Sequence, residues 1–333
     1  MRGAAKVAGQ PRWMLWGAII ALGAMVAMSV WTATIWHRAP VPGSQTVEVT
    51  IPRGTSLKGV AKALEEAGII EDALSFEIAA RLFGGERPVQ SGTYEFTRGD
   101  GWGSVLARLQ KGDVVTLFLP IPEGLPSIMV HERLMAAERL EGDVAVPAEG
   151  SVLPATWPMR PGEARTDVLA RMQAGMTRTL DELWPGRTAA SAVNTREEAI
   201  ILASIVEKET AKPDEHRRVA GLYTNRLKAG MKLEADPTVI YPVTKGKPLG
   251  RRIRQSELKA DTGYNTYAKA GLPAGPITNP GRASIAAVLD PEPHDYLFMV
   301  ADGSGGHAFA RTYAEHRNNV AKWYDLRRAK GEM

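Results

Sequence analysis

The chain has 333 residues, 44% of them hydrophobic and 23% charged, which fits about two globular domains and excludes a wholly disordered or collagen-like chain. It contains no cysteine, which excludes a disulfide framework, a thiolate zinc site, an iron–sulfur cluster and a cysteine nucleophile. The formal net charge is only +4, and without a basic arm or an aromatic-basic stripe this excess does not indicate a nucleic-acid partner.

An uncharged apolar run extends from Trp13 to Trp36 and is long enough for a membrane-spanning helix, which needs roughly 20 apolar residues. Tryptophans lie near both of its ends, as in the aromatic belts at membrane interfaces. Basic residues precede the run, so we expect residues 1–12 to be cytoplasmic, 13–36 to span the membrane once and the rest to be exported. A cleaved signal peptide is the alternative, but its apolar region would be shorter.

Residues 44–120 are predicted to form a small α+β domain. The pattern of apolar residues and turn residues predicts, in chain order, a strand at 46–51, a helix between the Thr55-Ser56 cap and Gly68, a helix at 74–83, a strand at 92–96, a helix ended by Gly112, and a strand at 114–119. Residues 121–165 are interpreted as an irregular connecting segment, since 141–163 is rich in Ala, Gly, Pro and Glu.

Residues 166–327 are predicted to form a larger α+β domain. It begins with a helix at 166–183 and continues with helices, short strands and long loops that contain Gly and Pro. Because long ordered loops on a scaffold are where functional sites are commonly built, we expect the site in this domain.

A helix predicted after Asn194 contains the main candidate for a catalytic residue. Thr195 and Glu198 form a capping-box pattern, and Pro213 is expected to end the helix. Its apolar stripe is Ala199, Leu202, Ile205 and Val206, and the next position on that stripe is Glu209. The opposite face carries Glu197, Ser204 and Lys208, with Glu207 toward its edge, and Glu207 and Lys208 are expected to be solvated helix charges.

An inward carboxyl is costly when ionised, so desolvation should raise the pKa of Glu209 toward neutrality. A carboxylic acid that stays protonated at working pH can act as a general acid at a glycosidic oxygen. The alternative is a structural carboxylate that reaches solvent or pairs with an arginine, since structural ion pairs also perturb pKa values.

Several segments, matched in order over essentially the whole chain, resemble the YceG-like family, whose members are endolytic murein transglycosylases of the MltG type. They are Ala203–Thr210, Asn225–Leu227, Leu233–Tyr241, Tyr264–Tyr267, Gly271–Ile277 and Val300–His307. The resemblance implies one membrane anchor, a small LysM-like domain (44–120) and a C-terminal catalytic domain (166–327). One segment departs from the family pattern: Val152–Trp157 has Ala155 where an aspartate is common.

The resemblance also implies the reaction. Glu209 matches the second glutamate of the family's Glu-Lys-Glu motif, the residue needed for catalysis. It would protonate the oxygen of the β-1,4 bond between N-acetylmuramic acid (MurNAc) and N-acetylglucosamine (GlcNAc). It would then act as the base while the C6 hydroxyl of the muramic acid attacks C1, leaving a 1,6-anhydro end. No cofactor or metal is expected, and none of the six histidines lies in a His-Glu-x-x-His pattern.

Other candidates for the substrate cleft are polar and aromatic loop residues. Asp236, Thr238 and Tyr241 follow a predicted strand start, and His307 ends a Gly-Gly-His turn. Tyr264, Asn265, Thr266 and Tyr267 offer aromatic faces and amides for sugars. The alternative is that they form turns, fill the core or order a loop, since an Asp-Pro pair such as 236–237 is common in turns.

The leading hypothesis is therefore a lytic transglycosylase of the cell inner membrane that cuts nascent peptidoglycan strands and ends their elongation. Its single anchor would leave the catalytic part periplasmic, and the resemblance implies peptidoglycan synthases (penicillin-binding proteins) as partners. The alternative is a membrane-anchored, non-catalytic glycan-binding scaffold in which Glu209 is structural.

Overall fold

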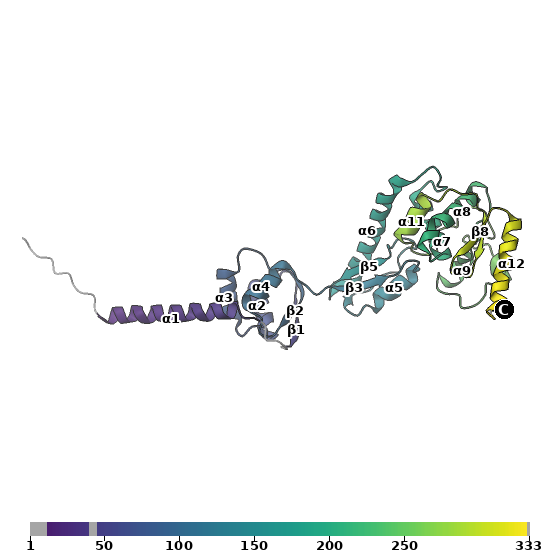
Figure 1. The fold of residues 1–333 in the computed structure, drawn as a ribbon. Helices are drawn as coiled ribbons and strands as arrows, with labels where there is room; N and C mark the ends of the chain where they lie inside the picture. The colour runs from purple at the N-terminus through teal and green to yellow at the C-terminus, as the bar shows by residue number, and fades with distance from the viewer. Residues whose placement is uncertain (1–11, 40–44, 332–333) are drawn as a thin grey trace, which may run out of the picture. The chain divides into compact units, whose positions relative to one another are not determined.

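The computed structural model describes residues 12–39 and 45–331 and divides the chain into two compact units, Met1–Thr116 and Leu117–Met333 (Figure 1). The mixture of helices and short strands confirms the predicted α+β class. Most of the expected cytoplasmic segment 1–12 lies outside the described residues.

The first unit begins with the apolar helix α1 (Arg12–Trp36). Its part Ile19–Trp36 is long and apolar enough to cross a membrane. The α/β part of the unit consists of β1 (Thr46–Ile51), α2 (Leu57–Glu66), α3 (Ala73–Phe83), β2 (Gly92–Thr97) and α4 (Trp102–Lys111). The two strands pair antiparallel from Thr46–Thr97 to Ile51–Gly92, and the three helices enclose a core that includes Phe76, Tyr94 and Trp102.

The second unit begins with an antiparallel strand pair, β3 (Leu117–Ile121) and β5 (Ala155–Met159). The strand expected at 114–119 in the small domain is therefore misplaced, because it starts at Leu117 and pairs within the second unit. The segment 141–163 is also not wholly irregular, since it contains β5. The sequence did not indicate this strand because it contains Pro158. Proline argues against a strand except at an edge, where its missing N–H donor is not needed.

Short elements complete this part of the second unit. They are α5 (Ser127–Ala136), the parallel pair β4 (Leu140–Glu141) and β6 (Glu163–Ala164), and α6 (Arg165–Leu183), which is followed by a 3₁₀ turn at Trp184–Gly186. Leu134, Met172 and their neighbours fill a core between α5, α6 and the β3–β5 pair.

A central helix, α7 (Arg196–Glu209), organises the rest of the unit and packs against α8 (His216–Lys228) and α11 (Arg282–Leu289). The Thr195 hydroxyl caps it by accepting from the backbone N–H of Glu198 at 3.1 Å, as predicted. The Glu198 carboxylate reaches one residue further back than expected and accepts from Asn194 N at 2.6 Å. The helix ends at Glu209, before the expected Pro213, which instead starts the 3₁₀ turn Pro213–Glu215.

The remaining elements are α9 (Asp236–Thr244), α10 (Gln255–Lys259), the antiparallel hairpin of β7 (Phe298–Ala301) and β8 (His307–Ala310), and α12 (Tyr313–Ala329). The strand expected around Asp236 is wrong, because that residue begins a helix. Pro237 lies in the first helical turn, where its fixed φ suits a helix.

A buried asparagine ties three loops of the second unit together. The Asn279 side chain donates to Leu125 O at 2.9 Å and to Ser127 Oγ at 3.0 Å, and it accepts from Val152 N at 3.0 Å. Because Asn279 is fully buried, water could not take over these hydrogen bonds if its side chain were removed.

We therefore expect Asn279→Ala to destabilise the second unit by about 2–4 kcal/mol, since it leaves buried polar groups unpaired. Urea unfolding of a fragment comprising residues 40–333 would measure the loss. Asn318→Ala, at an exposed position of α12, is the matched control and should change stability by less than about 0.5 kcal/mol. Equal stability of the two variants would contradict the role given to Asn279.

Candidate functional site

A cavity of about 340 Å³ opens in the second unit where the end of α7 meets α8, the β7–β8 hairpin and α12. Its walls are lined by Glu209, Leu222, Tyr223, Arg226, Leu233, Glu234, Asp236, Tyr267, Phe298, Met299, Val300, Ala301, His307, Tyr313 and His316. The mixture of carboxylates, one arginine and aromatic rings suits a polar ligand with apolar faces, such as a sugar.

Glu209 is the last residue of α7 and reaches this cavity from the buried side of the helix. The stripe that leads to it is fully buried at Leu202, Ile205 and Val206. Burial, helped by the negative charge of Asp236, raises the pKa of Glu209 to about 7, although the Tyr223 hydroxyl and the Arg226 guanidinium act to lower it. A substantial fraction of Glu209 is therefore protonated near neutral pH.

Tyr223 and Arg226 lie one turn apart on α8 and face this carboxyl. The Tyr223 side chain is 2% exposed and hydrogen-bonded to Glu209. Burial, together with the Glu209 charge, holds the pKa of Tyr223 well above its ordinary value, so it stays protonated and donates. The sequence analysis did not single out Tyr223. It lies just before the segment Asn225–Leu227, and its spacing of three residues from Arg226 places both side chains on one helix face.

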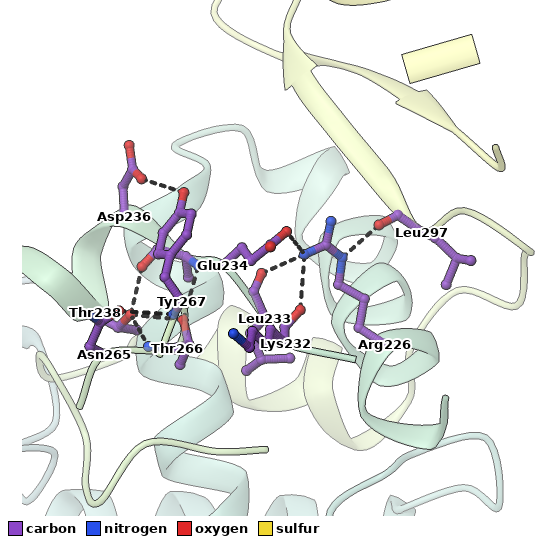
Figure 2. A network of polar contacts seen from close by, with 11 residues as sticks. Arg226, Lys232, Leu233, Glu234, Asp236, Thr238, Asn265, Thr266, Tyr267 and Leu297 are labelled. Carbon is purple, nitrogen blue, oxygen red and sulfur yellow. Dashed lines mark hydrogen bonds and ion pairs between the residues drawn. The ribbon is translucent and has the colours of Figure 1, made fainter. Parts of the chain in front are cut away.

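Arg226 is only 7% exposed, and its charge is satisfied by groups from two directions (Figure 2). Nε donates to Leu297 O at 2.6 Å, next to β7. Nη1 donates to Leu233 O at 2.9 Å and to the Glu234 carboxylate at 3.1 Å. The guanidinium also lies over the Phe298 ring, 5.5 Å from its centre. Arg226 thus connects the loop before α9 to the hairpin that forms the opposite wall.

Glu234 adopts a left-handed backbone conformation, with φ of 53°. This region is strained for a residue with a Cβ, and such strain persists only where the surroundings impose it. Here Arg226 holds the Glu234 side chain, and Thr266 O accepts from the backbone N–H at 3.2 Å. The strain therefore lies in the wall of the cavity, where it fixes the entry to α9.

Two of the sequence-predicted residues meet at the cavity wall beside Glu234 (Figure 2). The Tyr267 hydroxyl donates to Asp236 Oδ1 at 2.7 Å. Burial raises the pKa of Tyr267 far above its ordinary value, and its hydrogen bond to Asp236 adds to the effect. The pair places a carboxylate and a phenol ring side by side in the cavity, which the sequence indicated only as separate candidates.

Three other predicted contacts shape the loop instead of lining the cavity (Figure 2). Thr238 is fully buried, and its hydroxyl lies 2.9 Å from that of Thr266 and donates to Ala235 O. The Asn265 amide donates to Ala260 O at 2.8 Å and to two further carbonyls, and its oxygen accepts from Tyr267 N at 2.9 Å. These residues position Tyr267 and the start of α9.

Tyr241 and Tyr264 also lie outside the residues that line the cavity. Their rings pack together with centres 4.9 Å apart, and Tyr241 is hydrogen-bonded to Glu149. Burial raises the pKa of Glu149, and hydrogen bonds from Ser127 and Tyr241 offset part of this rise. The structure thus gives these two tyrosines a packing position, the alternative left open by the sequence.

His307 enters the cavity from the start of β8. Its Nδ1 lies 2.9 Å from Glu215 Oε2, and its backbone N–H donates to Glu215 Oε1 at 3.0 Å. Burial raises the pKa of Glu215, but the hydrogen bonds from His307 and Thr210 outweigh it and hold the pKa below its ordinary value. Because the ionised carboxylate only accepts, Nδ1 carries the proton of this hydrogen bond.

The face of α7 opposite its apolar stripe is partly buried. Glu207 accepts from Gly281 N at 2.9 Å and from the Ser284 hydroxyl at 2.7 Å, and Ser204 is fully buried and accepts from Ile277 N at 3.1 Å. The interpretation of Glu207 as a solvated charge is therefore wrong, because a central helix has neighbours on both sides. Glu197 and Lys208 are exposed, as expected for helix charges.

Residues 49–322 match the model of the YceG-like family. The chain belongs to the YceG-like family. It is 25% identical over 317 residues to the endolytic murein transglycosylase of Bacillus subtilis (strain 168), covering 86% of this chain and 87% of that protein. It is 26% identical over 325 residues to the enzyme of the same name from Streptococcus pneumoniae serotype 2, covering 83% of this chain and 58% of that protein.

A crystal structure of a YceG-like protein from Listeria monocytogenes has the same fold. The match has a TM-score of 0.52 and covers 83% of this chain and 99% of the Listeria protein, at 24% sequence identity. Within the described residues of this family member, no group of three or more His, Cys, Asp or Glu side chains lies together as a set of metal ligands.

The raised pKa of Glu209 predicts how stability depends on pH in this YceG-like chain. The carboxyl binds its proton more tightly in the folded state, with a pKa of about 7 against an ordinary value of 4.5, so its contribution to stability falls as pH rises through that window. Glu209→Gln removes this penalty. We therefore expect the melting temperature of the variant, relative to the wild type, to rise between pH 5 and pH 8.

Thermal unfolding of fragment 40–333 at several pH values would test this expectation. Glu197→Gln, an exposed carboxyl in the first turn of the same helix, is the matched control and should leave the difference flat. A Glu209→Gln variant whose relative stability does not change with pH would show that the carboxyl is not desolvated.

We also expect His307→Ala to lower kcat/KM for glycan cleavage by about tenfold, which corresponds to the loss of one hydrogen bond to the substrate. Glu215→Gln should cause part of that loss, because the neutral amide holds the His307 imidazole less firmly than the carboxylate does. Glu215 itself does not line the cavity. Asp325→Asn, an exposed carboxylate on α12, is the control that should retain full activity. Full activity of His307→Ala would remove the imidazole from the site.

Proposed function

We propose that this chain is an endolytic murein transglycosylase that cleaves the MurNAc-β-1,4-GlcNAc bond of nascent peptidoglycan and leaves 1,6-anhydro-MurNAc ends. The observation that carries the proposal is Glu209, a desolvated carboxyl with a pKa of about 7 in the wall of an open cavity. Family membership and two relatives with that printed activity support it.

In the proposed reaction Glu209 gives its proton to the glycosidic oxygen as the C1–O bond breaks. The resulting carboxylate then takes the proton of the muramic acid C6 hydroxyl while that oxygen bonds to C1. The products are a free GlcNAc hydroxyl and an anhydro sugar, and no water is consumed. Because the nucleophile belongs to the substrate, it is already held near C1, which is a large rate advantage.

Neighbouring groups support these steps. The Tyr223 hydroxyl donates to Glu209 and stabilises its carboxylate between the two proton transfers. The rings of Phe298, Tyr267 and Tyr313 line the cavity and offer flat apolar faces for sugar rings. His307 supplies a polar group on the opposite wall.

The placement of the enzyme is part of the proposal. Helix α1 would anchor the chain once in the inner membrane, with residues 1–12 cytoplasmic and the catalytic unit periplasmic. The α/β part of the first unit, residues 45–116, would be a LysM-like domain that holds or orients a glycan strand. Peptidoglycan synthases would be the partners, because an enzyme held close to the membrane meets strands as they are polymerised.

Product masses test the activity. Fragment 40–333 incubated with uncrosslinked glycan strands should release internal fragments with anhydro ends, each one water lighter than a hydrolysis product. Glu209→Gln, which keeps the shape of the side chain but removes the acid, should release none, and Glu197→Gln should match the wild type. Strand binding without cleavage by the wild type would instead favour the glycan-binding scaffold.

A second carboxylate in the same cavity makes hydrolysis the competing chemistry. Asp236 lies close enough to Glu209 to raise its pKa, and glycosidases that use water or a covalent intermediate need such a pair. The transglycosylase mechanism predicts that Asp236→Asn still forms anhydro ends, although more slowly. Reducing ends from the wild type that disappear in Asp236→Asn would assign the chain to the hydrolases.

A further inference from the structure

Helix α3 of the first unit has an apolar stripe that the described part of the chain leaves largely exposed. Leu74, Ile78 and Leu82 follow each other at four-residue intervals and are 66%, 49% and 70% exposed, and Phe83 at the helix end is 60% exposed. The opposite face of α3 is buried in the core of the unit through Phe76. A helix with two apolar faces needs a second partner besides its own core.

The stripe lies beside the end of the apolar helix α1. Ile35 is 6% exposed and belongs to the core of the α/β part, and the Trp36 ring packs against Phe83 with centres 5.7 Å apart. Gly103 at the start of α4 approaches Trp36 so closely that a Cβ would lie 2.6 Å from its Nε1. The last turn of α1 is therefore packed into the unit and is not a free tether.

An apolar groove of about 610 Å³ lies between the two helices. It is lined by Met28, Ser29, Trp31, Ala33, Trp36 and His37 of the α1 end, by Ser75, Ile78, Ala79, Leu82 and Phe83 of α3, and by Trp102. The groove thus follows α1 from Met28 onward, over roughly the last 12 Å of the helix at 1.5 Å per residue.

This position fixes the depth of α3 once α1 spans a bilayer. The span Ile19–Trp36 has 18 residues and a length of about 27 Å, close to the roughly 30 Å of a hydrocarbon core. The groove beside Met28–Trp36 would then lie at the level of one leaflet, on the side where the chain leaves the membrane. Water is scarce at that depth, so an exposed apolar stripe there is stabilised and not penalised.

We propose that α3 is an interfacial helix, with Leu74, Ile78, Leu82 and Phe83 in contact with the acyl chains of the leaflet on the exported side. This inference rests on the proposed anchoring of α1. The polar residues beside the stripe fit the same position: Glu77 is paired with Arg81 at 2.7 Å, and the long, 67% exposed Arg81 side chain can reach the lipid headgroups. The small unit is then held against the membrane surface by two helices.

Lipid contact can be measured with single-cysteine variants, because the chain has no cysteine of its own. The full-length protein carries an environment-sensitive fluorophore at Ile78→Cys or Leu82→Cys and is reconstituted in phospholipid nanodiscs with or without bromine on the acyl chains. Lys62→Cys on α2, with its side chain 73% exposed, is the matched water-facing control, and Met25→Cys in α1 reports on the anchor.

We expect bromine to reduce the emission at positions 25, 78 and 82 and to leave position 62 unchanged. Loss of emission at 25 but not at 78 and 82 would overturn the interfacial helix and leave the anchor intact. No loss at 25 would overturn the anchor and, with it, this inference. Positions 78 and 82 protected from aqueous iodide but insensitive to bromine would show that a protein surface, and not lipid, covers α3.

Discussion

The desolvation of one carboxyl at the end of α7 is the constraint on which the rest of the site depends. Leu202, Ile205 and Val206 bury the helix face that leads to Glu209, and α8 closes over it with Tyr223. A fully ionised Glu209 would be expensive there, so the surroundings hold it between its two protonation states. Arg226, buried and satisfied by main-chain carbonyls, contributes a positive charge to the cavity and ties its two walls together.

The sequence contained the central element of this arrangement but not its surroundings. A period of 3.6 residues is enough to place Glu209 on the apolar stripe, because that prediction needs only neighbours along one helix. Tyr223 and Arg226 come from a different helix, and their approach to Glu209 depends on how α7 and α8 pack. No spacing along the chain encodes that contact, and only the resemblance to the YceG-like family marked their region.

The side chains whose surroundings the sequence did not indicate share a physical feature. Thr238, Asn265 and Thr266 are small polar residues, which can bind a ligand or satisfy the backbone of an irregular loop equally well. The loop before α9 has many carbonyls and N–H groups to pair, and these side chains pair them. Glu207 was expected in water for a related reason: a helix-wheel pattern shows the most apolar face, but it does not show that a second, more polar face also packs.

A pKa near 7 has a further consequence for Glu209. A residue that must first give a proton and then recover one has to be accessible in both forms under a single set of conditions. If the carboxyl were far more acidic, it would rarely be protonated near neutral pH. If it were far less acidic, it would give up its proton too poorly to act as an acid. Near neutrality the free-energy difference between the two forms is close to zero, and in the proposed reaction the proton given to the glycosidic oxygen is replaced by the proton of the C6 hydroxyl.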